Sequence, residues 1–145
     1  TAALDAEFAK GTMKKVIQQT ATWDEAEAKK IVESVINSGE KFNVIYAEND
    51  GMAKGAVAAL DEAGITHGVK GDVIVMGFDC NKWALRELLA GNWNYDGQCS
   101  PFQAAVIENM IKTGKVTSKK VISEEKGFDA KTITKADIDT YGLGD

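Results

Sequence analysis

The sequence predicts an α/β domain built on a doubly wound, mostly parallel sheet. Short apolar stretches typical of buried strands alternate along the chain with amphipathic stretches typical of helices, and parallel sheets produce this alternation. Residues 72–79 have a continuously apolar centre, which indicates a strand covered on both faces. Because the single proline and the evenly spread glycines mark no linker, we expect residues 1–145 to form one domain.

Composition excludes several classes of function. The 145 residues suffice for one domain with a core, and 44% hydrophobic and 27% charged residues are ordinary for a soluble domain. The net charge of -5 disfavours a nucleic-acid surface, and no apolar run approaches the roughly 20 residues of a membrane span. Two cysteines and one histidine lack zinc-site spacing, so we expect no metal and no cofactor.

The first part of the chain predicts a helix, a strand and a second helix. We expect the first helix at residues 2–10 and a moderately β-prone strand at 13–20. Thr22 and Glu25 have the spacing of a capping box. The helix that follows carries its apolar residues at helical spacing, namely Ala28, Ile31, Val32, Val35 and Ile36, and ends at Gly39.

A buried strand is predicted at residues 42–47, followed directly by Asn49 and Asp50 and then by a helix of small residues that ends at Gly64. Ligands of parallel α/β sheets sit beyond the carboxyl ends of the strands, so a ligand would meet Asn49 and Asp50. The alternative is that one of them merely caps the helix. Similar polar residues after the next strands favour the ligand interpretation.

The second half of the chain continues the alternation. Ser100 and Pro101 form a favoured helix start. The elements predicted here are strand 72–79, a helix capped by Asn81 and ended by Gly91, strand 93–98, helix 101–113, a short strand at 121–122 and a helix over 134–141.

Aromatic and polar side chains fall at or just after the predicted strand ends, and all would emerge at one edge of the sheet. Sugars need both kinds, because their rings stack on aromatic faces while carboxylate and amide groups bind their hydroxyls. Each residue also has an ordinary structural interpretation as a core, cap or loop residue, and only the set together favours ligand binding. The candidate site residues are Trp23, Asn49, Asp50, Phe78, Asp79 and Gln98.

Four stretches, in their order and spacing, resemble the carboxyl-terminal half of class I periplasmic sugar-binding proteins of the ribose-binding type, which serve ABC transporters. These are Thr20-Ala21-Thr22-Trp23-Asp24, Asn49-Asp50-Gly51-Met52-Ala53 with Gly55-Ala56, Val75-Met76-Gly77-Phe78-Asp79, and Gln98. The resemblance implies a flavodoxin-like lobe of a type I binding protein whose ligand contacts are Trp23, Asn49, Asp79 and Gln98, with Phe78 alongside. It also implies carbohydrate transport without catalysis, outside the cytoplasm, by a secreted protein or a lipoprotein.

The same resemblance implies that part of a longer protein is absent. The chain opens at Thr1, without methionine and inside a predicted helix, and we expect the amino-terminal lobe, the first strand of this lobe and a sugar-gripping arginine upstream. A monosaccharide would bind between the lobes by hinge closure, and the closed form would meet an ABC permease. We expect residues 13–20 and 42–47 to flank a gap, and helix 101–113, exposed without its lobe, to promote self-association.

Two other functions remain open. The effector domain of a lactose-repressor-type transcription regulator shares this fold and similar motifs. An enzyme or phosphoacceptor domain of flavodoxin-like topology could use Asp79, but the acidic pair and lysine of a receiver domain are not found.

Cys80 and Cys99 each follow a candidate ligand residue. They sit just past the ends of strands expected to be neighbours, and adjacent strands are about 4.8 Å apart, within the range for a disulfide. An oxidising compartment would favour the bond. The alternative is two free, half-buried thiols.

Overall fold

The fold, taken from a computed structural model, is described for residues 2–99, 104–115 and 124–144. Its centre is a four-stranded sheet in the order β1-β2-β3-β4, made of β1 (Val44–Tyr46), β2 (Ile74–Asp79), β3 (Tyr95–Gln98) and β4 (Gly127–Asp129). The first three strands are parallel, and β4 runs antiparallel to β3. The predicted mostly parallel α/β architecture is therefore confirmed.

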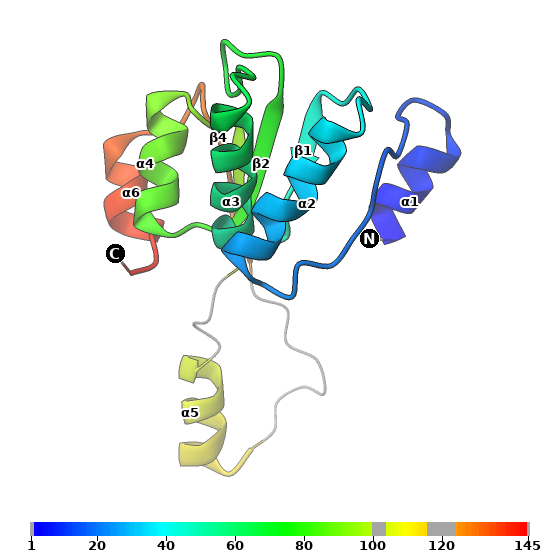
Figure 1. The fold of residues 1–145 in the computed structure, drawn as a ribbon. Coiled ribbons are helices and arrows are strands. Elements are labelled where there is room, and N and C mark those ends of the chain that lie inside the picture. The colour runs from blue at the N-terminus through cyan, green and yellow to red at the C-terminus, as the bar shows by residue number, and fades with distance from the viewer. Residues whose placement is uncertain (1, 100–103, 116–123, 145) are drawn as a thin grey trace.

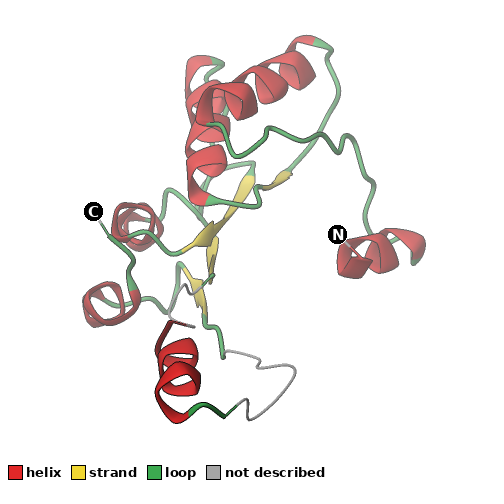
Figure 2. Ribbon diagram, turned by 90° about the horizontal axis from the view of Figure 1, so that it is seen from below, coloured by secondary structure: helices red, strands yellow, loops and turns green. Residues whose placement is uncertain are grey.

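Four helices cover one face of this sheet (Figures 1 and 2). They are α2 (Glu25–Asn37), α3 (Asp50–Glu62), α4 (Lys82–Ala90) and α6 (Lys135–Tyr141). Helix α3 packs on β1 and β2, α4 packs on β3, and the outer helices α2 and α6 contact α3 and α4 respectively. The core between these layers is apolar and includes Leu60, Val73, Val75, Leu85, Leu88 and Trp93. In the described part of the chain, no helix has the length and apolarity that crossing a membrane would require.

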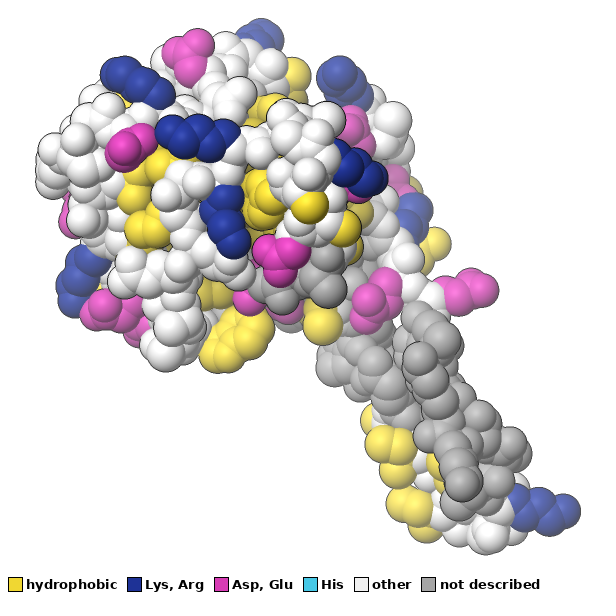
Figure 3. Space-filling view, turned by 90° about the vertical axis from the view of Figure 1, so that its right-hand side faces the viewer, with side chains coloured by type: hydrophobic (Ala, Val, Ile, Leu, Met, Phe, Trp, Pro, Cys, Tyr) yellow, Lys and Arg dark blue, Asp and Glu magenta, His cyan; other side chains and the backbone are white. Residues whose placement is uncertain are grey.

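Two further helices lie apart from this body (Figure 1). Helix α1 (Ala2–Ala9) precedes a long irregular segment, and α5 (Ala104–Thr113) projects away from the sheet. Figure 3 shows α5 standing out from the rest of the molecule with apolar side chains on its surface. Ile107 and Ile111 of α5 are 55% and 76% exposed.

Most helix boundaries follow the predicted signals. Asn49 caps α3, because its Oδ1 accepts a hydrogen bond of 2.7 Å from the backbone N–H of Met52. Gly91 ends α4 in the left-handed conformation, with φ of 82°, which glycine adopts without strain. Thr134 and Asp137 form a reciprocal capping box at the start of α6. The local sequence therefore sets where these helices begin and end.

The structure differs from the predicted elements in three places. Residues 13–20 form no strand, and Ile17 is 48% exposed, because a strand needs a neighbour for its backbone hydrogen bonds. Of the two strands expected to flank a gap in the sheet, only β1 is therefore formed. The cap of α2 is Asp24, which accepts from the backbone N–H of Glu27, since Thr22 turns into the left-handed region instead. Strand β4 was not predicted, and the strand predicted at 121–122 lies outside the described residues.

Gly55 lies where α3 closely approaches α2. A Cβ atom at this position would overlap the backbone carbonyl oxygen of Glu25 and lie 3.2 Å from the backbone nitrogen of Lys29. Beside it, the Nζ atom of Lys54 forms an ion pair with the carboxylate of Glu25 at 3.2 Å. The helix spacing therefore depends on the missing side chain of Gly55.

We predict that Gly55→Ala destabilises the chain by roughly 1–3 kcal/mol, the usual cost of an overpacked contact. The matched control is Gly51→Ala in the same helix, where the nearest atom to a new Cβ would be Asn49 Oδ1 at 3.8 Å. This control should gain up to about 1 kcal/mol from helix propensity. Urea unfolding of both variants measures the difference, and equal responses would contradict the close approach.

Candidate binding site

The carboxyl ends of β2 and β3 bring two of the candidate residues together. Asp79 and Gln98 end these strands and are directly paired in the parallel register. Asn49 follows β1, the neighbour of β2, and stands at the amino end of α3. Three candidate polar residues thus gather at one edge of the sheet, as the sequence predicted.

Asp50 lies beneath this edge rather than on it. Its side chain is fully buried, and its Oδ2 accepts hydrogen bonds from the backbone N–H and the side-chain Nδ2 of Asn81, at 2.8 and 3.0 Å. Asn81 precedes α4 but makes no side-chain cap bond, because its amide is turned to Asp50. The expectation that Asp50 contacts a ligand directly is therefore corrected, since its side chain is fully buried inside the lobe.

Asp79 is presented by a strained turn. Asp79 and the next residue, Cys80, have φ angles of 117° and 61°, a region that residues with a side chain rarely adopt. Partial burial raises the pKa of Asp79 above its ordinary value. Such strain persists only where the surroundings enforce it, and it tends to accumulate at functional sites.

A second strained turn carries Trp23. Thr22 and Trp23 have φ angles of 50° and 64°, and in the described residues only these two and the Asp79–Cys80 pair combine a side chain with a positive φ. The Trp23 ring is 68% exposed, just before α2, which packs on α3. Both strained turns therefore bear a candidate ligand residue, and Trp23 offers an open aromatic face.

Phe78 is the second aromatic candidate. It is half-buried, and its ring lies against that of Tyr46 on β1, with ring centroids 5.1 Å apart and a tilted geometry. A Cβ atom at Gly97 would lie 2.7 Å from the Phe78 ring, so glycine on β3 leaves the space that the ring occupies.

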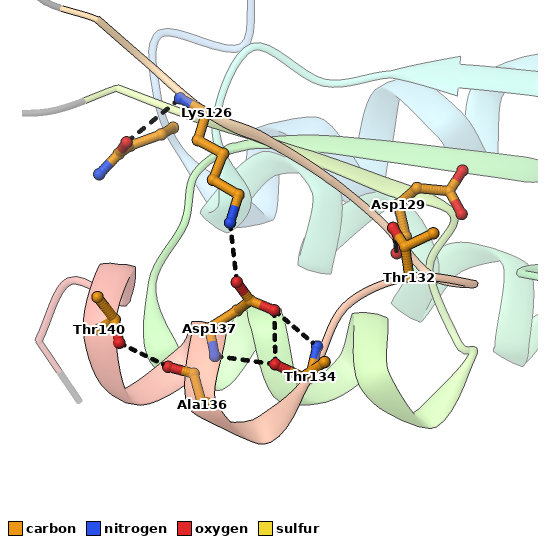
Figure 4. A network of polar contacts seen from close by, with 8 residues as sticks. Lys126, Asp129, Thr132, Thr134, Ala136, Asp137 and Thr140 are labelled. Atoms are coloured by element: carbon orange, nitrogen blue, oxygen red, sulfur yellow. Dashed lines mark hydrogen bonds and ion pairs between the residues drawn. The ribbon is translucent and has the colours of Figure 1, made fainter.

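Strand β4 and α6 fix the position of Gln98, a role for these elements that the sequence did not indicate. The backbone N–H of Gln98 donates to the Lys126 carbonyl at 2.8 Å, and its side-chain Oε1 accepts from the Lys126 N–H at 3.3 Å. The Nζ atom of Lys126 pairs with Asp137 at 2.8 Å (Figure 4) and lies over the rings of Phe128 and Tyr141. Hydrogen bonds from Lys126 and Thr134 lower the pKa of Asp137 to about 2.

Asp96, a fully buried residue of β3, was not among the residues predicted from the sequence. It belongs with Asp50, and burial raises the pKa of both groups, that of Asp50 to about 6 and that of Asp96 to about 8. An acidic residue inside a predicted buried strand was the available signal. The described residues contain no group of three or more His, Cys, Asp or Glu that could hold a metal ion.

The two cysteines are free thiols in the structure, so the disulfide considered from the sequence is not formed. The left-handed turn directs Cys80 inward, where it is fully buried and its Sγ donates to Asp96 Oδ1 at 3.6 Å. Cys99 is exposed. The strand ends are neighbours, but the two side chains face different surroundings.

Known proteins resemble this chain in sequence. The family model described as "Periplasmic binding protein domain" matches residues 1–105. The chain is 32% identical over 123 residues to the fructose import binding protein FruE of Bifidobacterium longum, a match covering 81% of this chain and 36% of that protein. It is 42% identical over 79 residues to a D-apiose import binding protein of Actinobacillus succinogenes, covering 54% of this chain and 24% of the relative.

Solved structures show the same fold over about half of their length. A solute-binding protein of an ABC transporter from Actinobacillus succinogenes, with bound D-allose, matches 96% of this chain and 48% of its own with a TM-score of 0.78 and 25% identity. The arabinose transporter component from Shewanella, bound to L-arabinofuranose, matches 97% of this chain and 48% of its own with a TM-score of 0.80 and 24% identity. The chain therefore spans about a quarter to a half of these proteins.

We predict that the two thiols differ strongly in reactivity. The thiolate is the reactive form, and burial raises the pKa of the Cys80 thiol far above its ordinary value. A disulfide-exchange reagent should therefore modify Cys99 quickly in the folded chain and Cys80 only after unfolding. Cys99→Ser should remove the fast phase. Two fast thiols in the native chain would contradict the burial of Cys80, and none under denaturing, non-reducing conditions would indicate a disulfide.

Proposed function

Because this chain belongs to the periplasmic binding protein domain family, we propose that it forms one lobe of a two-lobe protein that captures a sugar outside the cytoplasm for an ABC importer. The observation that carries the proposal is the placement of strain. The only two turns of the described residues that hold side chains at positive φ carry Trp23 and Asp79, an aromatic ring and a carboxylate, which are the two groups that sugar recognition needs.

The residues of the edge have complementary roles in this proposal. Asp79 accepts hydrogen bonds from two hydroxyls through its carboxylate, while the amides of Asn49 and Gln98 donate and accept. The ring of Trp23 stacks on the sugar, and Phe78 lies alongside. Asn49 uses its Oδ1 to cap α3, so its Nδ2 is the group directed to the ligand.

The names of the relatives support a monosaccharide as the ligand. The curated relatives above are import binding proteins for fructose and apiose, and the two solved structures hold allose and arabinofuranose. Fructose, apiose, allose and arabinose all offer several hydroxyls on a small ring. None of these relatives is a transcription regulator, so no observation favours the repressor alternative, and binding requires no catalysis.

The second lobe is part of the proposal. Good pockets bury roughly 70–90% of a ligand, whereas the edge of one sheet covers a ligand from one side. Helix α5, which projects from the body with Ile107 and Ile111 exposed, would pack within the other lobe. We propose that hinge closure completes the site and that the closed form is recognised by the membrane permease.

We predict that Asp79→Ala weakens sugar binding at least tenfold, about 1.4 kcal/mol, in a two-lobe protein that contains this chain. The variant loses the hydroxyl acceptor at the strand end. The matched control is Asp72→Ala, because Asp72 is exposed and precedes the opposite end of the same strand. Calorimetry with the monosaccharides named above measures both affinities. Equal affinity of Asp79→Ala and the control would remove Asp79 from the site.

We predict that residues 1–145 alone bind sugars no better than millimolar, since half of the contacts and most of the burial would be absent. Ligand-detected NMR with fructose, apiose, allose and arabinose tests this directly. Micromolar affinity of the isolated chain would contradict the two-lobe proposal while leaving the sugar-binding edge intact.

A further inference from the structure

Two carboxyl groups are buried together beneath the turn that carries Asp79. Asp50 reaches this place from the amino end of α3, and Asp96 reaches it from the middle of β3; both side chains are 0% exposed. Each carboxyl uses one oxygen on the turn, and the other oxygens, Asp50 Oδ1 and Asp96 Oδ2, have no further hydrogen-bond partner in the described residues. The two carboxyl groups lie close together, because Asp50 Oδ1 lies beside Gly77, the residue that is paired with Asp96 in the sheet.

Two ionised carboxylates cannot remain side by side at this depth. Burial of an unpaired charge is costly, and like charges that share a site raise the affinity of one of them for a proton. A single shared proton resolves the conflict, because it gives the pair one donor and one acceptor for the contact between them. The situation is the familiar one of two carboxyl groups that titrate as a unit.

We propose that Asp50 and Asp96 share one proton and that the pair holds residues 79–81 in the conformation that presents Asp79 to the ligand. Asp96 is then a positioning residue, and this assignment rests on the proposed function of the edge. The family resemblance did not predict that Asp50 has a partner on β3.

The hydrogen bonds of the pair lie on consecutive residues of the turn. Asp96 accepts from the Cys80 Sγ at 3.6 Å. Asp50 accepts from the backbone N–H and the side-chain amide of Asn81. The turn is thus bound at two successive residues, directly after the strained residue Asp79, and release of either carboxyl would free one of them.

Gly77 lies directly beside the carboxyl group of Asp50. A Cβ atom at Gly77 would lie 2.7 Å from Asp50 Oδ1 and 2.7 Å from the ring of Trp93. The carboxyl group of Asp50 therefore occupies the volume that a side chain on β2 would fill.

The titratable groups that act on the pair are Asp79 from β2 and Cys80 from the turn. Burial, followed by the nearby carboxyl groups, raises the pKa of the Cys80 thiol, so it stays protonated and donates to Asp96. The neighbour from α4, Asn81, is uncharged. Asp79 raises the pKa of Asp50 and so strengthens the hold of the pair on the shared proton, whereas the hydrogen bond from Cys80 lowers the pKa of Asp96.

The pair gives folding a defined dependence on pH. Both pKa values are raised, to about 6 for Asp50 and about 8 for Asp96, so the folded chain binds more protons than the unfolded chain between about pH 4, the ordinary pKa of Asp, and pH 8. Stability must therefore fall as pH rises through this range, and the contribution is complete only at its acidic end.

The test compares Asp96→Asn with the wild-type chain. Asparagine mimics the protonated acid, since its Nδ2 can donate to Asp50 while its Oδ1 accepts from Cys80. We expect the variant to lose most of the decline in stability between pH 5 and pH 8.5, measured by urea unfolding. The control Asp139→Asn changes an exposed acid on α6 and should keep the wild-type decline. A decline unchanged in Asp96→Asn would overturn the proposal.

A local measurement separates positioning from general stability. In Asp96→Ala, amide hydrogen exchange of Cys80 and Asn81 should accelerate at least tenfold relative to the amide of Val35 in α2, and Asp96→Asn should restore protection. Equal acceleration at all three amides would show a merely structural role and overturn the proposal. If the alanine variant does not fold, carboxyl carbon NMR of the wild-type chain decides, because two ordinary aspartate titrations would contradict proton sharing.

The affinity measurement distinguishes this proposal from the proposed function. In a two-lobe protein, Asp96→Ala should weaken sugar binding several-fold, and Asp96→Asn should recover most of the loss. A two-lobe protein that binds no sugar would refute the proposed function, while the exchange and titration results would still stand. Full affinity in Asp96→Ala would overturn the positioning role.

Discussion

The hydrogen bonds from Asn81 to the buried Asp50 carboxylate connect the elements that carry the candidate ligand residues. They tie the amino end of α3 to the turn between β2 and α4. Strand β3 joins through Asp96 and the Cys80 thiol. The ends of β2 and β3 and the start of α3 are thereby joined at the edge that carries the candidate ligand residues.

The chemistry of the edge is divided into two layers. The outer layer holds the proposed ligand-binding groups, such as the exposed Trp23 ring and the Asp79 carboxylate. The inner layer holds groups already engaged within the protein, namely Asp50, Asp96 and Cys80. The two layers also differ in the free-energy cost that they carry. Backbone strain lies in the outer turns, whereas the cost of desolvating carboxyl groups falls on the inner layer. Preorganisation of this kind reduces what must be ordered on binding.

The sequence predicted the strands β1, β2 and β3, the capping of α3 and the meeting of Asp79 with Gln98, because these depend on local periodicity and parallel order. It misplaced Asp50, since Asn and Asp after a strand can equally face a ligand or the interior. Asp96 and Lys126 were missed because their roles depend on residues distant in sequence. The strand expected at residues 13–20 failed for a related reason, as pairing needs a neighbour that periodicity does not supply.

The close approach at Gly55 also has a mechanical meaning. Helix α2 begins directly after the Trp23 turn, and α3 begins directly after Asn49. The backbone of Glu25 rests against Gly55, so the start of α2 is held against the second turn of α3. In the proposed site, the distance between the Trp23 ring and the Asn49 amide therefore depends on this helix–helix distance. A substitution that alters the α2–α3 distance would therefore change the shape of the proposed site without replacing any proposed ligand residue.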